Sequence, residues 1–147
     1  MGGSSTNFPD LGITNNVLDM MITVEAKNGT QDYENVPDDE IRRCFDMCRM
    51  LERYRKKYII FGFKFMKKGR DRKAKTMIWR KLREYYLVID VARPERFIDT
   101  ITCSYSNGIK YTIFKEEGDY NDIIDITSRE NLKAYLLQHE KQLTLVR

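Results

Sequence analysis

Residues 58–66 read Tyr-Ile-Ile-Phe-Gly-Phe-Lys-Phe-Met, a short aromatic and β-branched run that is followed at once by Lys67, Lys68 and Gly69. Side chains of this kind pack well on a pleated surface, and a bounded run of this length is typical of a buried strand. We therefore predict a buried strand over residues 58–66 and a very basic loop after it. Its alternating phenylalanines could stack on nucleic-acid bases, but core positions are the expectation.

An amphipathic helix is predicted immediately before this strand. Pro37 tolerates the first turn of a helix, and the three acids that follow it oppose the positive end of the helix dipole. Apolar residues then recur at helical spacing, namely Ile41, Cys44, Phe45, Cys48 and Leu51. This spacing predicts that the helix buries one face and exposes the arginines between these positions.

Further upstream, within residues 17–27, the even positions from Leu18 to Ala26 are apolar, while the polar residues Asp19, Thr23, Glu25 and Lys27 face the other way. That alternation predicts a half-buried strand. Asn28-Gly29 suits a tight turn, after which residues 30–36 are expected to pair back weakly. Residues 1–16 are rich in Gly, Ser, Thr and Asn and contain Pro9, so we expect a flexible N-terminal arm.

Downstream of the strand, the pattern predicts a second helix, a strand, a hairpin and a third helix. The second helix is marked by Ala74, Met77, Ile78, Leu82 and Tyr85. It leads into a strand over residues 86–91. Two β-rich runs flank Asn107-Gly108, which is a strong signal for a hairpin with a two-residue type I′ turn. Thr127 with Glu130 forms a capping box for a C-terminal helix that reaches roughly His139.

These elements predict one α+β domain over residues 17–147, preceded by the arm over residues 1–16. The expected architecture is a mainly antiparallel sheet with two or three amphipathic helices packed on it. A chain of 147 residues is long enough for one compact core and too short for two. No apolar run reaches the length of a membrane span, and the chain begins without the pattern of a signal peptide.

The charge of the chain is concentrated in its middle third. Residues 42–83 hold 17 of the 26 lysines and arginines but only three acids, a net charge of +14, whereas the whole chain has +4. Like charges at this density repel one another, so they indicate a polyanionic partner. The predicted polyanion-binding residues are Arg42, Arg43, Arg49, Arg53, Lys56, Lys57, Lys67, Lys68, Arg70, Arg72, Lys73 and Lys75. No helix-turn-helix, zinc-finger or RNP motif indicates that bases are read.

Catalytic and metal-binding classes find little support in the sequence. One histidine, His139, and the absence of a P-loop, a dinucleotide-binding loop or a nucleophile motif argue against an enzyme. Cys44, Cys48, Cys103 and His139 lack the spacing of a zinc knuckle, so no metal and no cofactor are expected, and the cysteines are expected to be reduced. Asp90 and Asp99 are interpreted as surface groups at strand ends.

The first residues fit a lipid-attachment pattern. Gly2 with Thr6 matches the N-myristoylation motif, although an engineered linker or chance would give the same letters. One myristoyl chain binds membranes only marginally and needs a second signal such as a polybasic patch. The basic middle third would supply that signal, so we expect membrane association through Gly2 and the cations together.

The order strand, extended loop, amphipathic helix and aromatic strand over residues 17–66 resembles the core of rhabdovirus matrix proteins. Thr23-Val24, Tyr33 and Val36 stand at spacings that are similar to those of that family. The resemblance implies a peripheral protein that self-associates, condenses the viral nucleocapsid and joins it to membrane. A lipid on Gly2 would replace the lysine-rich arm of the family.

The sequence therefore predicts a viral matrix-like structural protein that forms homo-oligomers and bridges viral nucleoprotein or RNA to an anionic membrane surface during virion assembly. Its expected locations are the host cytoplasm, membranes and the virion. The alternative is a sequence-independent nucleic-acid-binding accessory protein, such as a viral suppressor of host RNA responses. A small nuclease or another enzyme is a third possibility from a different class.

Overall fold

The computed structural model describes residues 11–29, 31–70, 77–114 and 119–146, which form one α+β domain. Its larger sheet has five strands in the order β1-β2-β4-β5-β8. Their bounds are Leu11–Asn15 for β1, Met20–Gly29 for β2, Lys56–Arg70 for β4, Met77–Val91 for β5 and Tyr120–Ile126 for β8. Only β2 and β4 run parallel, and the other neighbouring pairs are antiparallel. The predicted fold class is confirmed.

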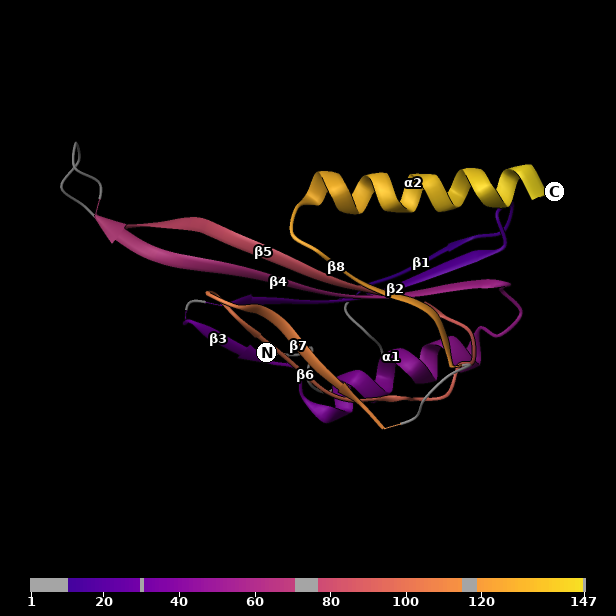
Figure 1. Ribbon diagram of the computed structural model, residues 1–147, viewed down its shortest axis with the longest axis horizontal. Coiled ribbons are helices and arrows are strands. Elements are labelled where there is room, and N and C mark those ends of the chain that lie inside the picture. The colour runs from indigo at the N-terminus through magenta and orange to yellow at the C-terminus, as the bar shows by residue number, and fades with distance from the viewer. Residues whose placement is uncertain (1–10, 30, 71–76, 115–118, 147) are drawn as a thin grey trace.

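A smaller sheet and two helices complete the domain. The smaller sheet has the order β3-β6-β7, with β3 at Tyr33–Asn35, β6 at Ile98–Ser104 and β7 at Gly108–Ile113. Helix α1 spans Asp38–Met50 and helix α2 spans Arg129–Val146. In Figure 1, α2 lies over one face of the five-stranded sheet, while α1 and the smaller sheet lie against the other face. The five-stranded sheet is thus the middle of three layers.

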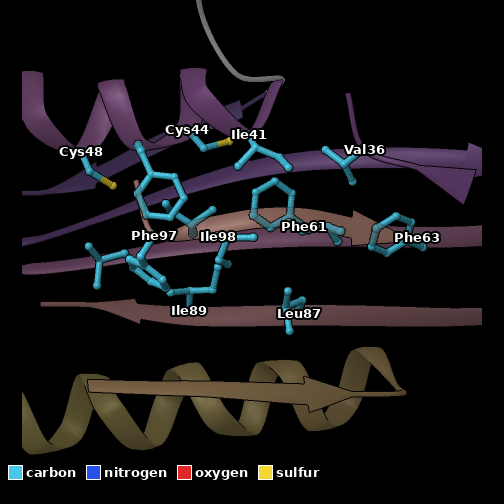
Figure 2. Close-up of a cluster of buried hydrophobic side chains, with 14 of the residues drawn as sticks. Val36, Ile41, Cys44, Cys48, Phe61, Phe63, Leu87, Ile89, Phe97 and Ile98 are labelled. Atoms are coloured by element: carbon cyan, nitrogen blue, oxygen red, sulfur yellow. The ribbon is translucent and has the colours of Figure 1, made fainter. Parts of the chain in front are cut away.

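The main hydrophobic core lies between the five-stranded sheet, α1 and β6 (Figure 2). The three phenylalanines of β4 point into it and are at most 1% exposed, namely Phe61, Phe63 and Phe65. From α1, the ring of Phe45 meets Phe97 edge-on with the ring centroids 5.1 Å apart. The predicted buried strand is confirmed, and its phenylalanines are core residues, as expected.

A second cluster fills the space between the other face of the sheet and α2. Tyr58, Ile60 and Val88 of the sheet pack here against the partly buried Leu132, Tyr135 and Leu136 of α2. The predicted C-terminal helix is confirmed, although its cap lies one residue later than expected. The Ser128 hydroxyl accepts a hydrogen bond from the Asn131 backbone N–H at 3.1 Å, so Ser128 and not Thr127 caps the helix.

The second predicted helix is wrong, because its described residues belong to β5, while Ala74 lies outside the described residues. The strand begins at Met77 and runs without a break to Val91, which includes the predicted strand over residues 86–91. The spacing of Met77, Ile78, Leu82 and Tyr85 satisfied a helical pattern by coincidence. Fifteen residues of β4 offer these positions a pairing partner, and this tertiary pairing overrides the local pattern.

The more deeply buried face of β2 is its odd-numbered, polar face, which corrects the predicted orientation of the strand, whereas the even-numbered face is partly buried at Ile22 and Val24 and exposed at Ala26. Its odd positions face α1, where Thr23 is 0% and Glu25 is 2% exposed. Glu25 tolerates this burial because Arg43 of α1 lies 4.0 Å from its carboxylate. Because α1 covers this face of β2, the acidic residue on it forms a buried ion pair with the helix.

Two expectations for the N-terminal region are also corrected. Residues 11–15 were assigned to a flexible arm but form β1, which pairs with β2 from Leu11 opposite Val24 to Asn15 opposite Met20. The prediction for residues 1–10 lies outside the described residues. Residues 33–35 do not pair back on β2, because β3 pairs with β6 in the smaller sheet.

The hairpin at Asn107-Gly108 is confirmed, with a different turn from the predicted one. Ser104 pairs with Gly108, so the connecting loop is longer than two residues. Gly108 has a φ of +78°. Among the described residues other than glycine, only Asp19 has a positive φ, so the φ of Asn107 is not positive. A type I′ turn would require positive φ at Asn107 as well, so this turn is of another type.

Candidate functional site

Strands β4 and β5 continue together beyond the rest of the sheet. The pairing of β2 with β4 ends at Phe65, and the pairing of β8 with β5 ends at Tyr86. Past these points β4 and β5 pair only with each other among the described residues, down to Arg70 opposite Met77. Figure 1 shows the two strands running out of the body on the side away from the end of α2. A two-stranded ribbon therefore projects from the domain.

We call residues 66–70 and 77–83 the basic ribbon. These two segments carry six cations and no acid, namely Lys67, Lys68, Arg70, Arg80, Lys81 and Arg83. The register places Lys67 opposite Arg80. Like charges directly opposite each other destabilise a strand pair by a few tenths of a kcal/mol to about 1 kcal/mol. An anionic partner that neutralises both charges would remove this repulsion.

The ribbon begins at a bulge. The register shifts between Phe65 and Met66, because Phe65 pairs with Arg83 while Met66 pairs with Lys81, which leaves Leu82 as the extra residue. Bulges bend a strand and increase its twist, and they re-aim the part that follows. The bulge thus marks the boundary between the sheet, which is held by the core, and the ribbon that leaves it.

The root of the ribbon is fixed to the loop between β6 and β7. Arg83 donates a hydrogen bond to the Tyr105 carbonyl oxygen at 2.9 Å and lies over the Tyr105 ring at 4.3 Å. Tyr85 donates to the same oxygen at 2.7 Å, and Phe65 packs edge-on against Tyr85. These contacts fix the direction in which the ribbon leaves the domain.

The predicted basic residues do not form one surface. Fourteen residues separate Lys56 from Arg70 along β4, a distance of about 46 Å at about 3.3 Å per residue. The cations at the end of α1 and in the loop after it therefore lie toward one end of the strand, and the ribbon lies at the other. Arg43 of α1 lies beside Glu25, which pairs with Phe61 in the middle of β4. Residues 49–57 and the ribbon cannot contact the same short stretch of a polyanion.

Three of the predicted cations are already compensated within the protein. Arg43 lies 3.4 Å from Asp39 and close to Glu25, and only 8% of it is exposed. Lys56 pairs with the buried Asp90 at 2.9 Å. Lys57 is buried and donates to a backbone carbonyl at 2.6 Å. Their charges stabilise the fold, so we leave these three out of the candidate surface.

The other predicted cations fall into three groups. Arg42, Arg49 and Arg53 are exposed at the α1 end, with Arg49 paired to Asp46 and Arg53 bonded to the Tyr54 hydroxyl. Lys67, Lys68 and Arg70 lie on β4 in the ribbon and not in a loop. Arg72, Lys73 and Lys75, like Gly2, lie outside the described residues.

Sequence reasoning missed three cations of the ribbon, Arg80, Lys81 and Arg83. It placed them on a helix, where they would not face the cations of residues 67–70. The aromatic and β-branched residues Ile78, Trp79, Tyr85 and Tyr86 were the available signal that this segment is a strand. The strand pairing brings the two groups of cations together.

Asp90 and Asp99, which were both predicted to be surface groups at strand ends, differ in burial. Asp99 is exposed, but Asp90 is only 3% exposed and accepts hydrogen bonds from Lys56 and from Asn121 at 3.1 Å. Asp90 is thus a structural ion-pair residue. Within the described ranges, no group of three or more His, Cys, Asp and Glu residues is arranged to hold a metal ion.

All three cysteines are free and buried. Burial raises the pKa of the Cys48 thiol and of the Cys103 thiol to about 12 each. Neutral, buried thiols are poor nucleophiles and poor metal ligands, because the thiolate is the reactive form. Cys44 and Cys48 occupy the core face of α1 (Figure 2), where they act as small apolar side chains.

Comparison of the chain with protein-family models, with curated proteins and with solved structures gave no match. In the part of the chain that the structure describes, neither helix combines the length and the apolar character needed to cross a membrane.

Proposed function

We propose that the protein binds the phosphate backbone of nucleic acid through its basic ribbon, without reading the base sequence. The observation that carries this proposal is a projecting two-stranded ribbon with six cations and no acid in its described segments. A ribbon that only needed protection from edge-to-edge aggregation could be protected by lysine, by proline or by a bulge, without a cluster of cations on both strands. Six cations on twelve residues exceed that need.

The geometry of the ribbon favours nucleic acid over a membrane surface. Successive residues of a strand belong to opposite faces, so the neighbours Lys67-Lys68 and Arg80-Lys81 give both faces of the ribbon basic positions. A flat membrane would meet only one face. A nucleic acid can surround both, as a single strand or, in B-form DNA, through a major groove wide enough to admit a two-stranded ribbon.

Within this proposal the protein is a non-enzymatic, matrix-like assembly protein. The ribbon would hold viral nucleoprotein or RNA, and a lipid on Gly2 would attach the protein to membrane. Support for this role comes from the charge of the ribbon, from the N-terminal pattern and from the resemblance to rhabdovirus matrix proteins over residues 17–66. Homo-oligomers would multiply these contacts, since weak sites that act together bind far more tightly than one.

The salt dependence of binding tests the proposal. Each phosphate neutralised by Lys or Arg contributes roughly 0.7 to 0.9 to the slope of log K against log salt concentration. Six ribbon contacts therefore predict a slope of about 4 to 5. Replacing Lys67, Lys68 and Arg70 by Glu should flatten the slope by about 2 to 3. The fold should persist, because Lys67→Glu places a carboxylate opposite Arg80 and replaces repulsion by attraction.

A matched control reverses three exposed arginines of α1 and the loop after it, outside the ribbon, with Arg42, Arg49 and Arg55 replaced by Glu. Both variants lose the same net charge, so a difference between them reports position. Equal weakening by the two variants would contradict the ribbon as the contact. Loss of binding to anionic vesicles, with nucleic-acid binding unchanged, would assign the ribbon to a membrane instead.

A further inference from the structure

A groove lies at the root of the basic ribbon, on the face of the five-stranded sheet that α2 covers. Helix α2 begins only at Arg129, so the ends of β2, β4 and β5 near the ribbon extend past its first turn. The space left there has a volume of about 310 Å³. This volume is at the lower end of the range for small-molecule sites, about 300 to 1,000 Å³.

The floor of the groove is apolar and its rim is charged, with more cations than acids. Val24, Ala26 and Ile60 form part of the floor, with Leu132 of α2 as one wall. Lys64 and Arg129 stand at the rim. Glu84 lies opposite Lys64 in the pairing of β4 with β5, and Glu84 and Arg129 both hydrogen-bond the Tyr86 side chain. Lys27 also lines it, but Glu40 lies 2.5 Å from its ammonium group. This chemistry suits a ligand with a flat or apolar part and an anionic group.

Tyr86 supplies an aromatic surface to the groove, and Gly62 makes room for it. The two residues are paired across β4 and β5, and a Cβ at position 62 would lie 3.3 Å from two carbons of the Tyr86 ring. The ring therefore lies across the space that any other side chain would occupy. Glycine weakens the interior of a strand, and it often marks a place where another group approaches the backbone closely.

The groove is continuous with the ribbon along β4. Lys64 lies two residues before Met66, where the ribbon begins, and two positions along a strand lie on the same face. A phosphate chain that follows the ribbon toward the body would pass Lys64 next. At that point its bases would lie beside the apolar floor and the Tyr86 ring.

We infer that this groove binds one unstacked nucleotide of single-stranded nucleic acid, with its base against Tyr86 and its phosphate between Lys64 and Arg129. The inference rests on the proposed function of the ribbon and specifies its substrate class. A base in a duplex is paired and stacked and cannot enter the groove, whereas an unpaired base is free to stack on an aromatic side chain. Single strands should therefore bind more tightly than duplexes at equal charge.

Substitution of Tyr86 tests how much stacking contributes to RNA binding, because it leaves the charge of the protein unchanged. Tyr86→Leu removes the ring and keeps an apolar side chain, and it should weaken binding of a short uridine-only RNA by about tenfold or more. Binding of a duplex should change little. Tyr86→Phe keeps the ring and serves as the matched control, with binding of the RNA close to that of the wild type. Circular dichroism and the melting temperature of each variant report whether it folds.

A crosslinking measurement on the wild-type protein keeps the inference testable even if Tyr86→Leu fails to fold. RNA with 5-iodouridine, irradiated in the complex and mapped by mass spectrometry, should crosslink to Tyr86. Crosslinks confined to other residues would overturn the inference. Equal binding of the RNA by the wild type and by a folded Tyr86→Leu variant would overturn it as well.

The same measurements distinguish this inference from the proposed function. Unchanged RNA binding by the Lys67, Lys68 and Arg70 reversal would refute the ribbon itself. Loss of binding in that variant, with Tyr86→Leu equal to the wild type, would refute only the groove. A groove that accepts oleate or anionic vesicles, and from which RNA does not displace them, would be a lipid site and would also overturn the inference.

Discussion

Gly108→Ala should destabilise the protein through one defined turn. Gly108 begins β7 and has a φ of +78°, in the region that L-amino acids rarely adopt. A side chain in the left-handed region costs about 1 to 2 kcal/mol. The Cβ would also lie 3.1 Å from a carbon of the Tyr85 ring, which is tighter than an ordinary contact.

The Tyr85 ring has little freedom to move away from this Cβ. Its hydroxyl donates to the Tyr105 carbonyl oxygen at 2.7 Å, and its ring packs edge-on against Phe65 with centroids 6.1 Å apart. We therefore expect the full backbone cost together with part of the steric cost, about 1 to 3 kcal/mol. For a chain of this length that corresponds to a melting temperature lower by roughly 2 to 10 °C.

Asn107→Ala is the control, measured by urea unfolding and by thermal melting beside Gly108→Ala. Asn107 is exposed, and the loop uses its backbone N–H, which donates to the Ser104 hydroxyl at 2.9 Å. Its replacement should change the free energy of unfolding by less than about 0.5 kcal/mol. A cost at Asn107 equal to that at Gly108 would indicate a type I′ turn and refute this reasoning. No cost at either position would place the turn elsewhere.

Two further predictions concern the thiols and the N-terminus. Iodoacetamide at pH 8 should alkylate Cys48 and Cys103 only after unfolding, because burial raises the pKa of each thiol from about 9 to about 12. Unfolding returns both pKa values to near 9, so between about pH 9 and pH 12 the unfolded state binds fewer protons than the folded state. The stability that the two buried, protonated thiols contribute is therefore lost as the pH rises from about 9 to about 12. Rapid alkylation of the native protein, followed by mass spectrometry, would contradict their burial. If Gly2 is myristoylated, Gly2→Ala should move the protein from membranes to the cytosol in fractionated eukaryotic cells, and an unmodified intact mass of the wild type would remove the lipid from the proposal.

Local signals were sufficient where a residue and its immediate neighbours decide the structure. The acids after Pro37 and the apolar positions from Ile41 onward correctly predicted α1. The run over residues 58–66 predicted a buried strand, and Asn107-Gly108 predicted a hairpin. In each case the deciding interactions reach only a few residues along the chain, namely helix capping, side-chain periodicity and turn conformation.

Local signals failed where a distant segment supplies the partner. The polar face of β2 was expected to meet water, but α1 covers it, and Glu25 is buried beside Arg43. Residues 33–35 were expected to pair with the preceding strand, but β6 takes them. Neither outcome can be read from residues 17–36, because the covering elements begin further along the chain.

Sequence patterns were enough to predict the α+β class, the concentration of positive charge in residues 42–83 and most of the core positions. Tertiary structure alone decided how that charge is arranged. Pairing of β4 with β5 turned a predicted loop and helix into a ribbon, placed Lys67 opposite Arg80 and left Lys56, at the other end of β4, about 46 Å from Arg70. Net charge depends only on composition, whereas the surface that it forms depends on strand register, which is set by contacts between segments far apart in the sequence.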